Sequence, residues 1–361
     1  MLAIGLMSGT SRDGIDAALI ETDGEGQVEA VAFHAKEYDD GFRLRLAEAC
    51  QRAMVMEKPG FEPLIASVEA DLTEYHVEAV ADLLGRSGHI AEDVRVIGFH
   101  GHTVAHRPEW AWTWQIGDGA ALAGAFGISV VGDLRSADVA AGGQGAPLLP
   151  VYHRALADRL TKPAAVLNLG GVANITFIGS DGTLIAFDTG MASGLIDNWM
   201  QTHGGAAYDA GGACAARGKV DEARLAAMMA DPWFAAPPPK SIDREQFSID
   251  AVRGLELEDG AATLTAFTAA AVARGVDHLP DRPAQIHVAG GGRHNATLMA
   301  MLAQRTGAEV LSVDRLGWDG DALEAQGFAY MAVRHLKGLP ISFPGTTGAP
   351  EPMTGGVLFQ P

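Results

Sequence analysis

Residues suited to binding a phosphate group occupy the first twenty positions of the chain. Apolar residues 2–7 lead into Ser8-Gly9-Thr10-Ser11-Arg12-Asp13-Gly14, and a second apolar run extends from Ile15 to Ile20. This pattern predicts two short strands joined by a turn of glycines and hydroxyl residues. Because glycine lets successive backbone N–H groups converge, such a turn can bind phosphate without a lysine.

The same construction occurs again near the middle of the chain. Apolar residues 164–169 lead into Gly170-Gly171-Val172-Ala173-Asn174, and residues 175–178 resume the apolar run. An Asp-Gly turn follows each copy, at residues 23–24 and 181–182, and predicts a further strand. The repeated unit indicates two similar domains that bind one nucleotide from opposite sides.

A third glycine cluster, Gly290-Gly291-Gly292-Arg293-His294-Asn295, follows the predicted strand 284–289. Three glycine loops, each at the carboxyl end of a strand, indicate that a ligand approaches the backbone there. None of the three matches the P-loop pattern or the regular dinucleotide-binding fingerprint, so those two kinds of site are disfavoured.

Composition narrows the classes of ligand and compartment. The 361 residues suffice for two domains, and the net charge of −19 disfavours a nucleic-acid or anionic-membrane surface. A polyanionic ligand must then be held by backbone dipoles and a metal ion. The two cysteines, Cys50 and Cys214, lie far apart in sequence, and we see neither a signal peptide nor a long apolar run. We therefore expect a cytoplasmic protein.

Three carboxylates beside the loops are candidates for catalysis. Asp13 and Asp16 flank the first loop, where they either accept local N–H bonds or hold Mg²⁺ through water, and Asp13 is the preferred metal candidate. Asp188 ends a predicted strand, within Phe187-Asp-Thr-Gly190, where a general base would face the expected inter-domain cleft. The alternative for Asp188 is a helix N-cap for the segment that starts near Ser193.

Other polar residues have two interpretations each. His100 and His102 end a strand without a third ligand nearby, so we expect one to be structural and His102 to contact substrate rather than zinc. Arg135 and Asp138 precede a glycine-dense segment and form either a structural ion pair or a substrate contact. Glu324 opens the last predicted helix, as a first-turn acid or a substrate contact.

The order of predicted elements supports a duplicated α/β fold. Apolar periodicity and glycines predict helices and strands in the same order in each half, followed by an irregular tail at 340–361. The helices are expected at 42–56, 63–84, 261–278, 296–305 and 322–335, and connecting strands at 94–99 and 128–133. We place the N-terminal domain at 1–134 plus 337–361 and the C-terminal domain at 135–336.

Together these motifs resemble those of the anhydro-N-acetylmuramic acid kinase family, in the superfamily of actin, sugar kinases and heat-shock-cognate ATPases. The resemblance covers nearly the whole chain. Its matching segments are residues 5–11, 13–16, 100–101, 115–118, 133–150, 167–174, 187–190, 289–295 and 346–350.

The resemblance implies a fold and an activity. The fold would be two actin-like, ribonuclease H-like domains with an ATP-binding cleft between them. The activity would be ATP- and Mg²⁺-dependent conversion of 1,6-anhydro-N-acetylmuramic acid to N-acetylmuramic acid 6-phosphate, in cell-wall recycling. Water would open the anhydro ring, and the freed O6 would accept the γ-phosphoryl group, a transfer that needs mainly positioning and charge neutralisation.

The resemblance also assigns residues. Asp188 would be the catalytic base that takes a proton from the attacking water. The residues that would bind ATP are Gly9, Thr10, Ser11, Arg12, Asp13, Gly14, Ile15, Asp16, Asn168, Gly170, Gly171, Asn174, Gly290, Gly291, Gly292 and Asn295. Those that would bind the sugar are His102, Arg135, Asp138, Gly190 and Glu324.

The chain departs from the family pattern at a few positions. Arg12 replaces an apolar residue, His102 replaces Gln, and Met191-Ala192-Ser193 replaces a Pro-Gly-Asn-like sequence. The alternatives are a kinase for another anhydro sugar such as levoglucosan, an ordinary hexose or carboxylate kinase, and a non-catalytic ATP-binding switch module. The sequence leaves a homodimer open and predicts no nucleic-acid or membrane partner.

Overall fold

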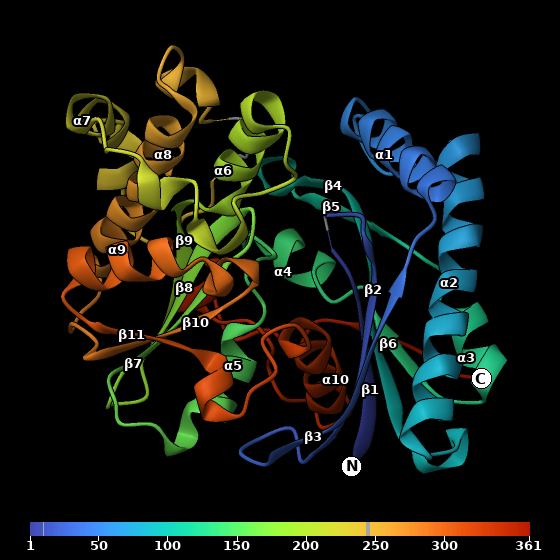
Figure 1. Ribbon diagram of the computed structural model, residues 1–361. Coiled ribbons are helices and arrows are strands. Elements are labelled where there is room, and N and C mark those ends of the chain that lie inside the picture. Colours follow the sequence, from blue (N-terminus) through green and yellow to red (C-terminus); the bar gives the residue numbers. More distant parts are fainter. Residues whose placement is uncertain (10, 243–245) are drawn as a thin grey trace. The chain divides into compact units, whose positions relative to one another are not determined.

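The computed structural model describes residues 1–9, 11–242 and 246–361, which fold into two compact units. The first unit comprises Met1–Asp158 and Ala322–Pro361, and the second comprises Arg159–Asp321. The chain therefore leaves the first unit once, completes the second and returns, as the colours of Figure 1 show. No helix in the described ranges is both long and apolar enough to cross a membrane.

Among the described residues, the first unit contains a sheet of seven strands in the order β12-β6-β4-β1-β2-β3, with β5 paired to β4. Strands β1, β2 and β3 are antiparallel neighbours, whereas β4 and β6 run parallel to β1. The strands are β1 (Leu2–Ser8), β2 (Gly14–Thr22), β3 (Val28–Glu37), β4 (Val96–Arg107), β5 (Trp112–Ile116), β6 (Val130–Gly132) and β12 (Val357–Phe359).

The described part of the second unit contains a five-stranded sheet in the order β11-β10-β7-β8-β9. Its strands are β7 (Ala164–Leu169), β8 (Val172–Ile178), β9 (Leu184–Met191), β10 (Gln285–Ala289) and β11 (Glu309–Ser312). Strands β7, β8 and β9 are antiparallel, and β10 and β11 run parallel to β7. This order repeats that of β1, β2, β3, β4 and β6, so the predicted duplication of an α/β domain is confirmed.

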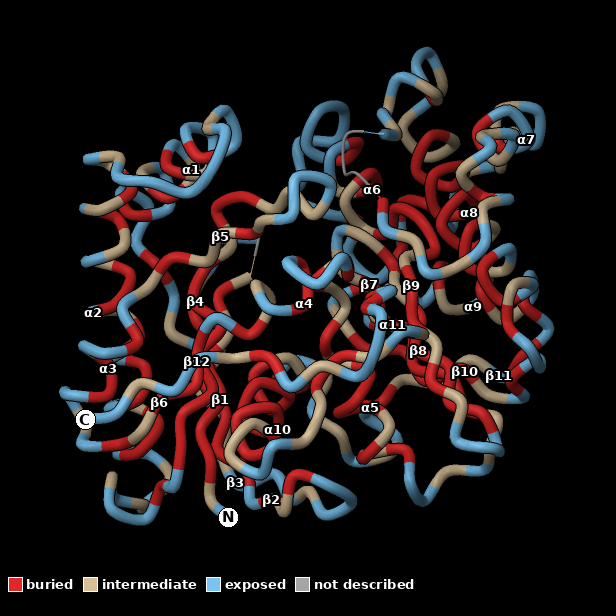
Figure 2. Tube along the Cα trace, turned by 180° about the vertical axis from the view of Figure 1, so that it is seen from behind, coloured by how far each residue is buried: buried red, intermediate tan, exposed pale blue. Residues whose placement is uncertain are grey.

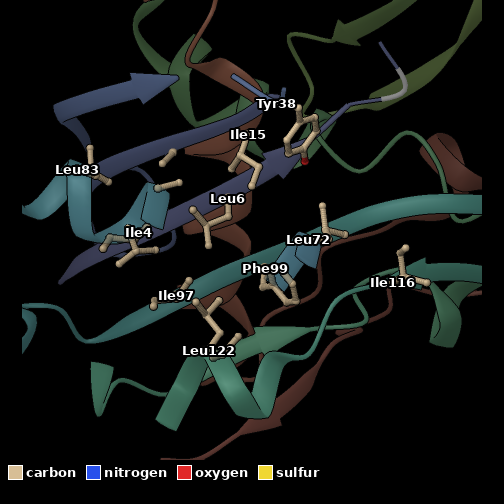
Figure 3. Packing of buried hydrophobic residues seen from close by; sticks show 14 of the residues in the cluster. Ile4, Leu6, Ile15, Tyr38, Leu72, Leu83, Ile97, Phe99, Ile116 and Leu122 are labelled. Atoms are coloured by element: carbon tan, nitrogen blue, oxygen red, sulfur yellow. The ribbon is translucent and has the colours of Figure 1, made fainter. Parts of the chain in front are cut away.

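The helices of the first unit are α1 (Asp40–Met54), α2 (Pro63–Ser87), α3 (Gly119–Phe126), α4 (Ser136–Ala140), α5 (Pro150–Leu156), α10 (Leu323–Leu336) and α11 (Pro344–Thr347). Helices α2 and α10 pack on opposite faces of the sheet. On one face, Ile4, Leu6 and Phe99 pack with Leu72 of α2 in the buried cluster of Figure 3. Alternation of side chains along a strand puts the neighbouring residues on the opposite face.

On that opposite face, Gly5 of β1 lies beside Gly98 of β4, so neither strand carries a side chain at this point. A Cβ atom at Gly5 would lie 1.8 Å from the Ala325 carbonyl oxygen, and one at Gly98 would lie 2.0 Å from that of Phe328. Helix α10 therefore packs directly on the strand backbones, and Figure 2 shows α10, β1 and β4 mostly buried. This contact fixes the carboxyl ends of β1 and β4 relative to Glu324.

The helices of the second unit are α6 (Ser193–Trp199), α7 (Glu222–Met229), α8 (Leu257–Val276) and α9 (Ala296–Thr306). Val272 and Val276 of α8 and Leu298 of α9 share one buried cluster with strand residues such as Leu167 and Phe187. Residues 168 and 188 alternate with these apolar residues and so point away from this core.

Two expectations differ from the structure. Residues 135–158 and 322–336, which we assigned to the second domain, pack in the first unit, because α10 fits the glycine strip on β1 and β4. The tail is not irregular throughout: α11 forms a helical turn, and β12 pairs with β6 antiparallel. The pairing extends the edge of the sheet and places Phe359 against Gly119 and Gly132, where glycine leaves room for its ring.

Candidate active site

Three polar side chains form a row across the second sheet. The strand register pairs Asn168 of β7 with Asn174 of β8, and Asn174 with Asp188 of β9. Residues directly opposite each other on neighbouring antiparallel strands project from the same face. All three are half-buried, whereas their neighbours along each strand, such as Leu167, are buried. The row is therefore a partly exposed polar strip across three neighbouring strands.

The register of the β8–β9 hairpin puts Asp188 into this row, and a β-bulge follows it. The pairing is unbroken from Ile178 opposite Leu184 to Asn174 opposite Asp188. Ala173 pairs with Gly190 but Asn174 pairs with Asp188, so Thr189 is an extra residue in β9. Thr189 is buried and packs against Gly275 of α8, where a Cβ would lie 2.6 Å from its methyl group. The bulge therefore changes the pairing only of the residues that follow Asp188, and Asp188 itself keeps the register that the hairpin turn sets. A bulge here bends β9 just beyond the polar row.

Two of the predicted glycine loops converge beside Asn168. Strand β10 pairs with β7 so that Ala289 lies opposite Asn168, which brings Gly290 to the same sheet edge. Gly290 has φ +76°, and a Cβ there would lie 2.6 Å from the Asn168 side-chain oxygen. A Cβ at Gly292 would lie 2.6 Å from that of Leu169. These two glycines are required by the packing of the loops on each other.

Gly171 and Gly291 are not required by packing within the protein. A Cβ atom at either position would meet nothing within 4 Å, and neither residue has a positive φ. Packing within the protein therefore does not require glycine at these two positions. Glycine at an unobstructed loop position fits a ligand that approaches the backbone closely. The cradle that the sequence predicts is thus compatible with the residues present.

The third loop is held by a buried arginine. Arg293 donates to both carboxylate oxygens of Asp321 (2.8 and 2.9 Å), to Asp314 (3.2 Å) and to the Gly290 carbonyl (3.1 Å). The hydrogen bond with Asp321 raises the pKa of Arg293 against the opposing effect of burial, so the guanidinium stays charged. Arg293 therefore links the Gly290 loop to Asp314 and Asp321.

Two predicted ligand contacts in the second unit have structural roles. Asn295 caps α9 through its side-chain oxygen, which accepts from the Leu298 N–H (2.9 Å). Gly190, with φ +150°, is buried where a Cβ would lie 2.9 Å from that of Ala271. Its glycine is explained by packing against α8.

In the first unit, the loop between β1 and β2 is anchored at its start by a buried hydrogen-bond chain. Ser8 Oγ lies 2.7 Å from the Tyr38 hydroxyl and 2.9 Å from His102 Nδ1, and His102 Nε2 lies 3.7 Å from the Cys50 thiol. His102 is 1% exposed. Burial, followed by the charge of Arg12, lowers the pKa of His102 to about 4. The residue we expected to contact substrate therefore supports the loop as a neutral side chain.

The loop itself carries exposed acidic and polar groups. Asp13 is exposed and accepts from Ser11 Oγ (2.6 Å), and Arg12 has a left-handed backbone with φ +57°. The Arg12 guanidinium acts on Cys50 and His102, so it folds back over the first unit. Thr10, an expected ATP contact, lies outside the described residues.

The described residues include no group of three or more His, Cys, Asp or Glu side chains suited to binding a metal. Asp13 supplies one accessible carboxylate, and the charges of both Asp13 and Asp16 act on the buried Tyr38 hydroxyl, whose pKa is raised mainly by burial. A single first-loop carboxylate fits a cation held largely by water and phosphate oxygens.

Arg135 is positioned by His100. The Arg135 Nε–H donates to His100 Nε2 (3.1 Å), and Nη1 donates to the Gly145 carbonyl (2.7 Å). Because Nε2 accepts, the Nδ1–H of His100 donates to the Gly101 carbonyl (2.9 Å). Burial, followed by the charge of Arg135, lowers the pKa of His100 well below its usual range. A neutral histidine thus orients a charged arginine.

Glu324 belongs to the same electrostatic group. Removal from water raises the pKa of its carboxyl, Arg135 opposes that shift, and the charge of Asp13 adds to it. Burial lowers the pKa of Arg135 to about 10, so it remains cationic at neutral pH. The structure therefore brings together Asp13, Arg135 and Glu324 from three distant parts of the chain.

Asp138 is 1% exposed and has protein partners on both oxygens. It accepts from the Gly145 N–H (2.6 Å), Ser342 Oγ and Thr347 Oγ1 (2.6 Å). Of the two interpretations of Asp138, the contacts favour the structural one, although its partners are these donors rather than Arg135. It joins the glycine-dense segment to the C-terminal segment.

Comparison with known proteins identifies the family. The sequence profile described as anhydro-N-acetylmuramic acid kinase matches residues 1–361. The chain belongs to the anhydro-N-acetylmuramic acid kinase family. It is therefore an enzyme, a phosphotransferase. Members of the family from Rhizorhabdus wittichii and Zymomonas mobilis are 62% and 55% identical, covering 100% and 99% of this chain and 99% of each relative.

A solved structure supports the fold of this kinase. Component A of (R)-2-hydroxyglutaryl-CoA dehydratase from Acidaminococcus fermentans superposes with a TM-score of 0.51 at 12% identity. The alignment covers 92% of this chain and 98% of the other. At this identity the likeness concerns the fold alone, and it agrees with two sheets of repeated topology.

Some residues of the site have no sequence motif. Tyr38 belongs to no recognisable motif, yet its hydroxyl forms a hydrogen bond with Ser8. The sequence around Arg293 resembles that of a surface arginine before a helix, although Arg293 bonds to Asp321. His100 stands out in the sequence, but its contact with Arg135 joins residues 35 positions apart. The one available signal for Arg293 is its place inside the third glycine cluster.

His102→Gln, which replaces the buried imidazole with a side chain that does not titrate, should make stability less dependent on pH. The unfolded His102 takes up a proton near the ordinary histidine pKa of 6.5, whereas burial lowers the pKa of the folded one to about 4. Unfolded chains bind more protons between these values, so wild-type stability is full above pH 6.5 and falls as pH drops towards 4. The loss from this residue is on the order of 3 kcal/mol by pH 4.

Urea unfolding of both proteins between pH 7 and 4 measures this difference. The other buried histidines titrate in both proteins and cancel from the comparison. Parallel stability curves would show that His102 is not neutral in the folded protein.

Proposed function

We propose that this enzyme hydrolytically opens the 1,6-anhydro ring of 1,6-anhydro-N-acetylmuramic acid and phosphorylates O6, giving N-acetylmuramic acid 6-phosphate. The observation that carries the proposal is the position of Asp188, which pairs with Asn174 in the polar row that also contains Asn168. A carboxylate held at such an edge, next to loops suited to phosphate, suits proton abstraction from water.

The bonds change in one coupled sequence. Asp188 takes a proton from water as the water oxygen bonds to the anomeric carbon. The bond from that carbon to O6 breaks, and O6 with its electron pair attacks the γ-phosphorus of ATP. ADP leaves, and Asp188 releases its proton to solvent, so one water and one ATP are consumed per sugar. Positioning and neutralisation of charge carry most of phosphoryl transfer.

The backbone loops would bind ATP. We assign the second phosphate loop to Gly170 and Gly171, with Asn168 and Asn174 beside it, and the nucleoside side to Gly290–Gly292. In support, a Cβ at Gly171 or Gly291 would meet no protein atom within 4 Å. The first loop, Gly9–Asp16, would supply further phosphate contacts. Asn295 and Ile15 would contribute through the shape of the backbone, since Asn295 caps α9 and Ile15 is buried.

Mg²⁺ would accompany the phosphates, held through water by Asp13. When bound, the cation neutralises charge on the phosphate oxygens. The net charge of −19 supports a need for such neutralisation beyond the backbone dipoles. Asp13 remains exposed at the loop and close enough to Glu324 to affect its pKa.

We assign sugar contacts to Arg135 and Glu324, which are half-buried and opposite in charge. His102, Asp138 and Gly190 would act through the shape of the site, because all three are buried against protein atoms. The enzyme would work in the cytoplasm during cell-wall recycling, and its two free cysteines are compatible with a reducing compartment.

Asp188→Asn should lower kcat by roughly 10²–10⁴-fold, the usual contribution of a positioned base. ATP affinity should change little, because the phosphate loops retain their backbones. Mass spectrometry of products from 1,6-anhydro-N-acetylmuramic acid, levoglucosan and hexoses identifies the sugar used. Near-normal turnover by the variant, or a product other than N-acetylmuramic acid 6-phosphate from the wild type, would contradict the proposal.

Gly171→Ala should weaken ATP binding without destabilising the protein. The added methyl group meets no protein atom, but it obstructs a phosphate at the backbone, and loss of one charged hydrogen bond raises KM for ATP roughly tenfold. Gly85→Ala, in α2 and equally unobstructed, is the matched control. Thermal melting and initial rates test both. An unchanged KM for ATP in Gly171→Ala would remove this loop from the nucleotide site.

A further inference from the structure

Asp188 is held by a short segment that lies outside the glycine loops. The Asp188 N–H donates to the Lys240 carbonyl (2.9 Å), and Asp188 Oδ2 accepts from the Ile242 N–H (3.0 Å). The backbone of Lys240–Ile242 therefore contacts both the main chain and the carboxylate of the same residue. This pair of bonds limits rotation of the carboxylate as well as movement of β9.

The segment is itself fastened at each of its residues. Lys240 Nζ donates to the Trp233 carbonyl (3.0 Å) and lies 4.3 Å from the centre of the Trp233 ring. The Ser241 carbonyl accepts from Trp233 Nε1 (3.1 Å), and the Ile242 side chain is buried in an apolar cluster of this unit. Burial lowers the pKa of Lys240, so this fastening keeps a cation partly out of water.

Prolines restrict the chain before the segment, and Trp233, which contacts the segment, lies in a short helix. Pro237, Pro238 and Pro239 precede Lys240, and proline has one allowed range of φ. Trp233 belongs to the short 3₁₀ helix Pro232–Ala235, whose Phe234 packs edge-on against Phe267 of α8. The contacts of Asp188 thus lead through Lys240–Ile242 to the aromatic core beneath it.

We propose that Lys240–Ile242 is a positioning segment for Asp188, in which the Ile242 N–H orients the carboxylate towards the attacking water. This inference rests on the proposed function, in which Asp188 is the base. A donated N–H also favours the charged form of a carboxylate, which is the form that accepts a proton. The segment acts through its two backbone contacts with Asp188.

Ile242→Pro tests the N–H directly, because proline has no N–H to donate. Ile242→Ala is the matched control, since it truncates the same side chain but keeps the donor. We expect Ile242→Pro to lower kcat by roughly 10–100-fold, the scale of a misplaced catalytic group, with KM for ATP unchanged. In a plot of kcat against pH, the fall in kcat on the acid side should begin at a higher pH in Ile242→Pro than in Ile242→Ala, because the carboxylate has lost a donor that favours its charged form. Equal kcat and equal pH profiles in the two variants would overturn the proposal.

The side chain of Lys240 gives a second test that leaves the backbone N–H in place. Lys240→Met removes the donors to Trp233 and Phe234, whereas Lys240→Arg keeps a charged donor over the Trp233 ring. We expect kcat to fall several-fold in Lys240→Met and to be restored in Lys240→Arg, with KM for ATP unchanged in both. Should Ile242→Pro melt far below the wild type, this pair decides, and wild-type kcat in Lys240→Met would overturn the proposal.

Asp188→Asn separates this inference from the function on which it rests. A nearly active Asp188→Asn would contradict the proposed base itself. An inactive Asp188→Asn together with unaffected segment variants would overturn the positioning segment alone.

Discussion

The register of the β8–β9 hairpin decides which way Asp188 points. Because side chains alternate along a strand, pairing of Asn174 with Asp188 puts the carboxylate on the face that carries Asn168 and Asn174. The extra residue Thr189 shifts the pairing only beyond Asp188, and its side chain is buried against Gly275 of α8. The bonds to Lys240 and Ile242 then hold Asp188 in place. The proposed chemistry depends on this register more than on any single contact to a ligand.

The first unit holds its own set of polar groups on a closely packed sheet and helix. Gly5 and Gly98 admit α10 onto the strand backbones, and that contact places Glu324 near Asp13 and Arg135. Two buried, neutral histidines hold residues of this site in position. His100 accepts a hydrogen bond from Arg135, and His102 forms one with Ser8 at the start of the first loop. Burial lowers the pKa of both histidines and keeps them uncharged, so they add no positive charge of their own beside Arg12 and Arg135.

Local patterns were enough to predict the duplicated strands and the glycine loops that follow three of them, because turns and alternation depend on neighbouring residues. They were not enough where function depends on distant packing. Asp138 resembles a substrate contact until Ser342 and Thr347, which lie 204 and 209 positions along the chain, are seen to donate to it. The predicted boundary between the two units differs from the observed one for the same reason. The sequence of α10 alone does not reveal that this helix packs on Gly5 and Gly98. The bulge at Thr189 likewise has no local signature.

The most direct test follows oxygen from water. The wild-type enzyme is supplied with 1,6-anhydro-N-acetylmuramic acid, ATP and Mg²⁺ in water enriched in ¹⁸O, and the products are analysed by mass spectrometry before the sugar exchanges oxygen with solvent. If Asp188 activates water against the anomeric carbon, the label enters the sugar, and ADP and phosphate contain none. Label in inorganic phosphate, with an unlabelled sugar, would mean that water attacks ATP and would contradict the coupled mechanism.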